Sequence, residues 1–123
     1  MKTIDSFKPG GRGVMATADA SGAVNTAIYA SPRIIDEHTV AWGMTERRTY
    51  QNVRENPNAS YLYIDPGGGF LGVRLSLRLK ELKDSGPLLE EIRENTRTVS
   101  SPSAAEAVKY VAYFTIVEKR PLV

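Results

Sequence analysis

The clearest pattern in the sequence is Leu71-Gly72-Val73-Arg74-Leu75-Ser76-Leu77-Arg78-Leu79-Lys80, in which every odd position is apolar. The even positions carry glycine, serine or basic side chains. Because successive side chains of a strand point to opposite faces of its sheet, this alternation predicts a strand with one buried and one solvated face. We expect the odd positions, Leu71 to Leu79, to face the core.

The segments on either side of this strand predict further strands and two helices. Before it, the glycine-rich break 66–69 follows an aromatic and branched strand at 59–65. Other strands are expected at 14–18, 23–30, 39–42 and 110–117, with a short optional strand at 33–35. One helix is predicted at 45–56, ending before Pro57, and another begins at Pro87. Residues 98–103, which include Pro102, are expected to form a loop, with a helical turn possible after it.

The strand-rich order favours a mainly β (α+β) fold. Several strands are joined by tight turns, which suits an antiparallel barrel better than a doubly wound parallel sheet. A nearly closed barrel also leaves few unpaired strand edges. With 123 residues and no internal repeat or linker, the chain is expected to form a single domain over residues 1–123.

The composition excludes several classes of function. No cysteine is present, so thiolate metal sites, iron–sulfur clusters and thiol catalysis are excluded. The single histidine, His38, argues against a His-rich metal site or a Ser-His-Asp triad. A net charge of +2 is too small for a nucleic-acid groove or a membrane anchor. No apolar stretch reaches the ~20 residues of a membrane helix, and the first five residues lack a signal-peptide core, so a cytoplasmic protein is expected.

The stretch richest in chemical information is Gly43-Met44-Thr45-Glu46-Arg47-Arg48-Thr49-Tyr50-Gln51-Asn52, where a predicted strand gives way to a helix. Arginine at a helix N-terminus opposes the helix dipole unless an anion is bound there. A phosphate would accept bonds from the backbone N–H groups, from the hydroxyls of Thr45 or Thr49, and from a guanidinium. Two solvated arginines on an exposed helix face explain the same residues, and the sequence leaves both readings open.

Two other stretches could contact a ligand. Asn25, Thr26 and Ala27 place polar groups at the start of an otherwise apolar strand, although an ordinary strand end has the same composition. Gly67-Gly68-Gly69-Phe70 would let the backbone approach a flat ligand closely, although a flexible hairpin loop is an equally good reading.

Taken in order, these segments resemble the FMN-binding split-barrel family, which includes pyridoxamine 5'-phosphate oxidase. The resemblance runs from about Gly13 to Val117. It rests on the hairpin at 16–22, Val24-Asn25-Thr26, the stretch 43–53, Asn56-Pro57 and the segment 69–74. It is strongest to the small FMN-binding proteins of about this length, in which a basic residue followed by threonine holds the phosphate, as Arg48-Thr49 would here.

The resemblance implies a six-stranded antiparallel Greek-key split β-barrel with two helices. It also implies a homodimer with FMN at the subunit interface. Tyr61, Tyr63, Tyr110 and Tyr113 exceed what one small core obviously needs, which also favours an interface. The implied contacts are with the ring, the phosphate and the ribityl chain. The residues concerned are Asn25, Thr26, Ala27, Gly43, Met44, Thr45, Arg47, Arg48, Thr49, Asn52, Gly69, Phe70 and Leu71.

The function implied is that of an oxidoreductase or an electron carrier. FMN supplies its own redox chemistry, so the lack of obvious catalytic side chains is expected. The alternative is a non-catalytic module that holds FMN, a deazaflavin or haem; haem would need an axial ligand, and His38 is the only histidine. The chain lacks the length and the Arg/His substrate residues of pyridoxamine 5'-phosphate oxidases, so that activity is not expected. The electron donor and acceptor stay open.

Overall fold

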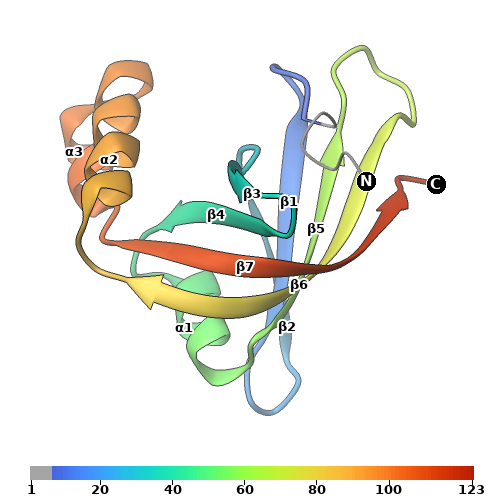
Figure 1. Cartoon of the computed structure of the whole chain (residues 1–123), viewed down its shortest axis with the longest axis horizontal. Coiled ribbons are helices and arrows are strands. Elements are labelled where there is room, and N and C mark those ends of the chain that lie inside the picture. Colours follow the sequence, from blue (N-terminus) through green and yellow to red (C-terminus); the bar gives the residue numbers. More distant parts are fainter. Residues whose placement is uncertain (1–6) are drawn as a thin grey trace.

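The structure is a computed structural model that describes residues 7–123, so the N-terminal stretch that lacks a signal-peptide core lies outside the described residues (Figure 1). The strands are β1 (Arg12–Ala18), β2 (Val24–Ile28), β3 (Arg33–Asp36), β4 (Thr39–Met44), β5 (Asn58–Ile64), β6 (Gly72–Lys83) and β7 (Tyr110–Pro121). The helices are α1 (Arg48–Glu55), α2 (Pro87–Val99) and α3 (Pro102–Ala107). None of these helices is long and apolar enough to span a bilayer.

The strands form one antiparallel sheet in the order β2-β1-β5-β6-β7-β4-β3. β1 pairs with β5, and β4 pairs with β7, so strands that are distant in sequence lie side by side. The long strands β6 and β7 run together across the molecule, with α1 on one side and α2 and α3 at one end (Figure 1). The predicted mainly β, antiparallel barrel fold is therefore confirmed.

The structure has one strand and one helix more than the six strands and two helices of the implied barrel. The additional strand, β3, corresponds to the optional strand expected at 33–35. It pairs with β4 across a tight turn, but three of its four residues are exposed, so its sequence carries no core-facing pattern. The extra helix, α3, begins at Pro102, where a loop was expected. Proline is well tolerated at the first position of a helix, and the Ser101 hydroxyl caps this end by accepting the Ala104 N–H at 3.1 Å.

β6 follows most of the predicted alternation. Val73, Leu75 and Leu77 are buried, and Leu75 has no exposed surface. The prediction was wrong for Leu71, which precedes the strand and is 72% exposed. The neighbouring strand β5 ends at Ile64, which is paired with Gly72, so no strand residue lies opposite Leu71.

An aromatic cluster fills the barrel interior and fixes the segment that follows β2. The Trp42 ring lies 4.7 Å from that of Tyr61 and 5.7 Å from that of Phe114, measured between centroids. The indole Nε1 of Trp42 donates to the carbonyl of Ala30 at 2.7 Å. The Tyr61 hydroxyl donates to the carbonyls of Tyr29 and Ala30, at 3.1 and 2.9 Å. These bonds hold Tyr29 at the barrel wall.

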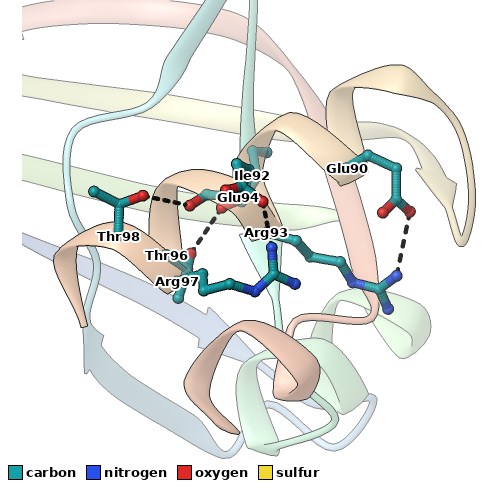
Figure 2. Close-up of polar contacts among 7 residues, drawn as sticks. All are labelled: Glu90, Ile92, Arg93, Glu94, Thr96, Arg97 and Thr98. Carbon is teal, nitrogen blue, oxygen red and sulfur yellow. Dashed lines mark hydrogen bonds and ion pairs between the residues drawn. The ribbon is translucent and has the colours of Figure 1, made fainter. Parts of the chain in front are cut away.

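α2 covers one end of the sheet. It buries Leu89 and Ile92 against Ala41, Val108 and Val111. It also carries two ion pairs between residues three positions apart, Glu90–Arg93 and Glu94–Arg97 (Figure 2). Exposed pairs of this kind add little stability, so the buried apolar side chains dominate the attachment of α2.

Candidate functional site

The candidate site lies where β4 gives way to α1. The helix begins at Arg48, three residues later than predicted, and Arg47 is its extended N-cap residue. No side chain of the described residues caps this end, and the first turn holds no acidic residue. The first N–H groups of a helix have no partner within the helix and carry the positive end of its dipole. This end of α1 is therefore open to an anion.

Two pockets flank the start of α1. The inner pocket, of about 390 Å³, lies between β2, the end of β4 and the helix start, and is lined by Ala27, Ile28, Tyr29, Gly43, Thr45, Arg47 and Thr49. The outer pocket, of about 600 Å³, lies between the β1–β2 turn and α1, and is lined by Asp19, Ala23, Val24, Glu46, Arg47, Arg48, Gln51, Asn52 and Glu55. Arg47 borders both pockets, so one ligand could extend from one into the other past this side chain.

Three carboxylates border the outer pocket, and each has a partner elsewhere. Asp19 accepts hydrogen bonds from the hydroxyl and the backbone N–H of Ser21, at 2.7 and 2.9 Å, and the hydroxyl bond is the main cause that lowers the pKa of Asp19. Glu55 accepts a hydrogen bond from the backbone N–H of Ala20, in the β1–β2 turn, at 3.0 Å. Glu46 accepts the Tyr110 hydroxyl at 3.3 Å. These carboxylates keep their charge beside the outer pocket, but none of them forms an ion pair with Arg47 or Arg48.

Arg47 and Arg48 have no ion-pair partner among residues 7–123. Both side chains are exposed, whereas Thr49 is buried at the bottom of the same turn. Two unpaired guanidinium groups beside uncapped helix N–H groups are well suited to bind an oxyanion, since guanidinium and phosphate form bidentate hydrogen bonds.

Seven of the sequence-predicted residues meet around the start of α1. The inner pocket collects five of them and the outer pocket three, with Arg47 shared. They are Ala27, Gly43, Thr45, Arg47, Arg48, Thr49 and Asn52.

Other predicted residues lie outside both linings or are used elsewhere. Asn25 and Thr26 lie on β2 but line neither pocket. Met44 is only 1% exposed, so its side chain belongs to the core. Asn52 borders the outer pocket, but its amide Nδ2 donates to Oγ1 of Thr17 at 3.0 Å and so ties α1 to β1.

Gly69, Phe70 and Leu71 lie at the opposite end of β5 from α1. The helix is followed directly by β5, and the glycine loop comes only after its seven residues, roughly 20 Å further along the strand. In Figure 1 this loop and α1 lie at opposite ends of the molecule. Within one chain, these three residues therefore do not reach the site.

The sequence reasoning missed Tyr29, which lines the inner pocket. Burial raises the pKa of the Tyr29 hydroxyl, and the side chain of Thr49 lowers it in part. The available signal was its spacing from Ala27, because residues two apart on an extended chain face the same side. Tyr29 adds a polar hydroxyl beside the small and apolar side chains of Ala27 and Ile28, opposite the polar side chains of the helix start.

Gly43 serves packing as well as the pocket. A Cβ atom at this position would lie 2.8 Å from Cγ2 of Ile92 and 3.0 Å from Cγ1 of Val108. These distances are closer than ordinary van der Waals contact, so the glycine lets α2 and the segment after α3 approach β4. Its place in the sequence therefore does not by itself indicate a ligand.

No family model and no curated protein matches this sequence. Solved structures do match. An FMN-binding protein from Syntrophomonas wolfei subsp. wolfei has a TM-score of 0.79 at 19% identity, covering 99% of this chain and 82% of that one. An F420 reductase has a TM-score of 0.69 at 17% identity, covering 94% of each chain. HutZ, a heme storage protein from Vibrio cholerae, has a TM-score of 0.63 at 12% identity, covering 89% of this chain and 84% of that one.

Identities this low show a shared fold. The proteins named above differ in the cofactor that their names state, so the likeness itself does not select FMN, F420 or haem. The three matches nevertheless extend over 89–99% of this chain, so they cover nearly all of it. The chain thus has the split-barrel fold shared by FMN-binding proteins and pyridoxamine 5'-phosphate oxidase-like proteins.

Proposed function

We propose that this protein binds FMN non-covalently, with the phosphate at the start of α1 and the ring in the inner pocket. The observation that carries the proposal is the pair Arg47 and Arg48, unpaired among residues 7–123, beside an uncapped helix end. A phosphate dianion would neutralise both charges and accept hydrogen bonds from the backbone N–H groups at the start of the helix. The inner pocket next to it combines Ala27, Ile28 and Gly43 with polar groups of Tyr29, Thr45 and Thr49, and cofactor pockets likewise combine apolar surface with a few placed polar groups.

The proposed roles of the site residues follow from their positions. Arg47 borders both pockets and would hold the phosphate where they meet, while Arg48 would approach it from the outer pocket. Ala27 would leave room for the edge of the ring. The Tyr29 hydroxyl would donate a hydrogen bond to an oxygen or nitrogen of the ring. Thr49 would orient the Tyr29 hydroxyl from below.

Bound FMN would supply the electron-transfer chemistry, so we class the protein as an oxidoreductase or an electron carrier. A deazaflavin with a phosphate group is the second candidate, because it needs the same anion site, and an F420 reductase shares the fold. Haem is less well supported by the residues present. His38 is the only histidine, its side chain is 75% exposed, and it lines neither pocket. A cytoplasmic location is part of the same proposal.

Mass spectrometry of the small molecule released on denaturation tests the cofactor. We expect yellow protein that releases FMN, and we expect His38→Ala to release the same molecule in the same amount. Release of a deazaflavin or haem would contradict the FMN proposal. Protein purified without ligand would be titrated with FMN, and failure to bind it at micromolar concentration would also contradict the proposal. Bleaching of the yellow form by a nicotinamide donor would favour an oxidoreductase.

We further propose that the protein is a homodimer and that the partner's hairpin loop completes each site. Tyr61 and Tyr63, expected to supply part of the interface, are 0% and 2% exposed and belong to the barrel core. Exposed apolar side chains occur elsewhere, on the edge strand β2 and on the β5–β6 loop. They are Val24, Ile28, Phe70 and Leu71, which are 71–82% exposed. Apolar exposure on an edge strand and a hairpin is typical of surfaces that a partner covers.

Light scattering tests the assembly. At micromolar concentration we expect a mass about twice 13.5 kDa. Phe70→Asp should shift the protein towards the monomer and weaken FMN binding, because a charge would be buried in the interface. Val99→Asp is the matched control, since Val99 is 73% exposed at the end of α2, far from the hairpin loop. A wild-type monomer that binds FMN tightly would contradict the dimer.

A further inference from the structure

A third pocket lies between the barrel and α2, and we call it the helix pocket. It has a volume of about 200 Å³. The segment after β2 forms one wall, β4 forms the floor, and α2 with the segment after α3 forms the other wall. Its lining consists of Tyr29, Ala30, Ser31, Arg33, Ala41, Trp42, Gly43, Ile92, Asn95, Thr96 and Val108. Tyr29 and Gly43 also line the inner pocket, so the two pockets are neighbours that share a wall.

Arg33 is the only charged residue in the lining of the helix pocket. Its Nη1 atom lies 2.9 Å from Oε1 of Glu91 on α2, which holds the guanidinium across the mouth of the pocket. The other guanidinium nitrogens have no acceptor among residues 7–123. Glu91 is not part of the lining, and its side chain is 64% exposed. Among the described residues the lining itself therefore holds no carboxylate, and its one guanidinium is paired at a single nitrogen with Glu91.

The other polar groups of the lining are mostly engaged or peripheral. The Thr96 hydroxyl donates to the carbonyl of Ile92 at 2.8 Å, as Figure 2 shows, and so keeps only acceptor capacity towards the pocket. The indole N–H of Trp42 donates to the backbone carbonyl of Ala30. What remains is an apolar surface formed by Trp42, Ile92 and Val108. Around it lie the polar groups of Arg33 and Tyr29 and the exposed side chains of Ser31 and Asn95.

We propose that the helix pocket binds a small molecule that carries one carboxylate on a flat apolar body. The carboxylate would accept hydrogen bonds from the guanidinium nitrogens of Arg33 that do not contact Glu91. Such charge-assisted hydrogen bonds are stronger than those between neutral groups. The apolar body would lie on Ile92 and Val108. Its position next to the inner pocket, across Tyr29, would make this molecule the substrate or electron acceptor of the bound cofactor. That last role rests on the proposed function, whereas the binding site itself does not.

The structure offers a direct readout, because Trp42 is the only tryptophan of the chain and lines the helix pocket. The apoprotein would be titrated with benzoate, a flat ring with one carboxylate, while Trp42 fluorescence is recorded. Benzamide is the uncharged probe of the same shape. We expect saturable binding of benzoate at least about 10-fold tighter than that of benzamide, since a hydrogen bond to a charged group is at stake.

Two variants assign the preference to Arg33. Arg33→Gln should bring benzoate to the affinity of benzamide. Arg78→Gln removes the same charge from the exposed face of β6, outside this pocket, and should leave the preference unchanged. Glu91→Gln frees the guanidinium and should keep or strengthen benzoate binding. Equal affinities for the two probes in the wild type, a lack of saturation, or an unchanged preference in Arg33→Gln would overturn the proposal.

Parallel titration with FMN separates this proposal from the proposed function. Benzoate binding without FMN binding would remove the cofactor proposal and keep the helix pocket as a carboxylate site. FMN binding without benzoate binding would remove the carboxylate site and keep the cofactor proposal. If both bind, benzoate should also change the visible absorption of bound FMN, because the two pockets share Tyr29 and Gly43.

Discussion

Leu75→Ala should lower the free energy of unfolding by about 2–5 kcal/mol, the range for leucine truncation in a packed core. Leu75 lies in the middle of β6 and has no exposed surface, and it belongs to the same cluster as Tyr61 and Phe114. Truncation would remove its buried methyl groups and leave a cavity among large aromatic neighbours that cannot collapse easily. Chemical denaturation monitored by Trp42 fluorescence would measure the change.

Ser76→Ala is the matched control on the adjacent position of the same strand. Ser76 faces the other side of the sheet and is partly exposed, so its replacement should cost less than about 1 kcal/mol. Both variants should unfold with an unchanged m-value. A larger loss for Ser76→Ala than for Leu75→Ala would mean that the register of β6 is shifted by one residue, because such a shift exchanges the two faces.

The register of β6 was predictable because the signal is local and repeats over several residues. Val73, Leu75 and Leu77 alternate with polar residues, and one strand period explains all of them. β3 could be predicted only as an optional strand, since it is four residues long and mostly exposed and depends on its pairing with β4. Leu71 continues the alternating pattern but not the strand, because burial there depends on where β5 ends.

The site was predictable to the extent that it is contiguous in sequence. Thr45, Arg47 and Thr49 meet because they lie within five consecutive residues where β4 gives way to α1, so their proximity is local. Tyr29 joins them from the segment after β2, held by a hydrogen bond from Tyr61, 32 positions further along the chain. No local sequence pattern predicts a contact of this kind. The loop at Gly69 was a possible ligand contact because of its consecutive glycines, and the resemblance grouped it with the site, but the chain's own topology places it at the far end of β5.

Arg47→Ala should weaken FMN binding by about 1.5–3 kcal/mol, or roughly 10- to 100-fold, which is the scale of a hydrogen bond to a charged group. Arg48→Ala should weaken it too, but by less than Arg47→Ala, because Arg48 borders only the outer pocket. Isothermal titration of the apoproteins would measure both. Arg54→Ala provides the control: it removes a charge from the last turn of the same helix, where Arg54 lies over the Tyr50 ring, and should leave the affinity unchanged.

Riboflavin decides whether these arginines act on the phosphate. It has the ring and the ribityl chain of FMN but no phosphate, so wild type, Arg47→Ala and Arg48→Ala should bind it equally. An equal loss of riboflavin and FMN affinity would mean that the arginines act on the fold or on the ring, and the phosphate assignment would fail. High salt should reduce the affinity of the wild type for FMN but not for riboflavin, because screening weakens only the contact between charges on the exposed arginines and the phosphate.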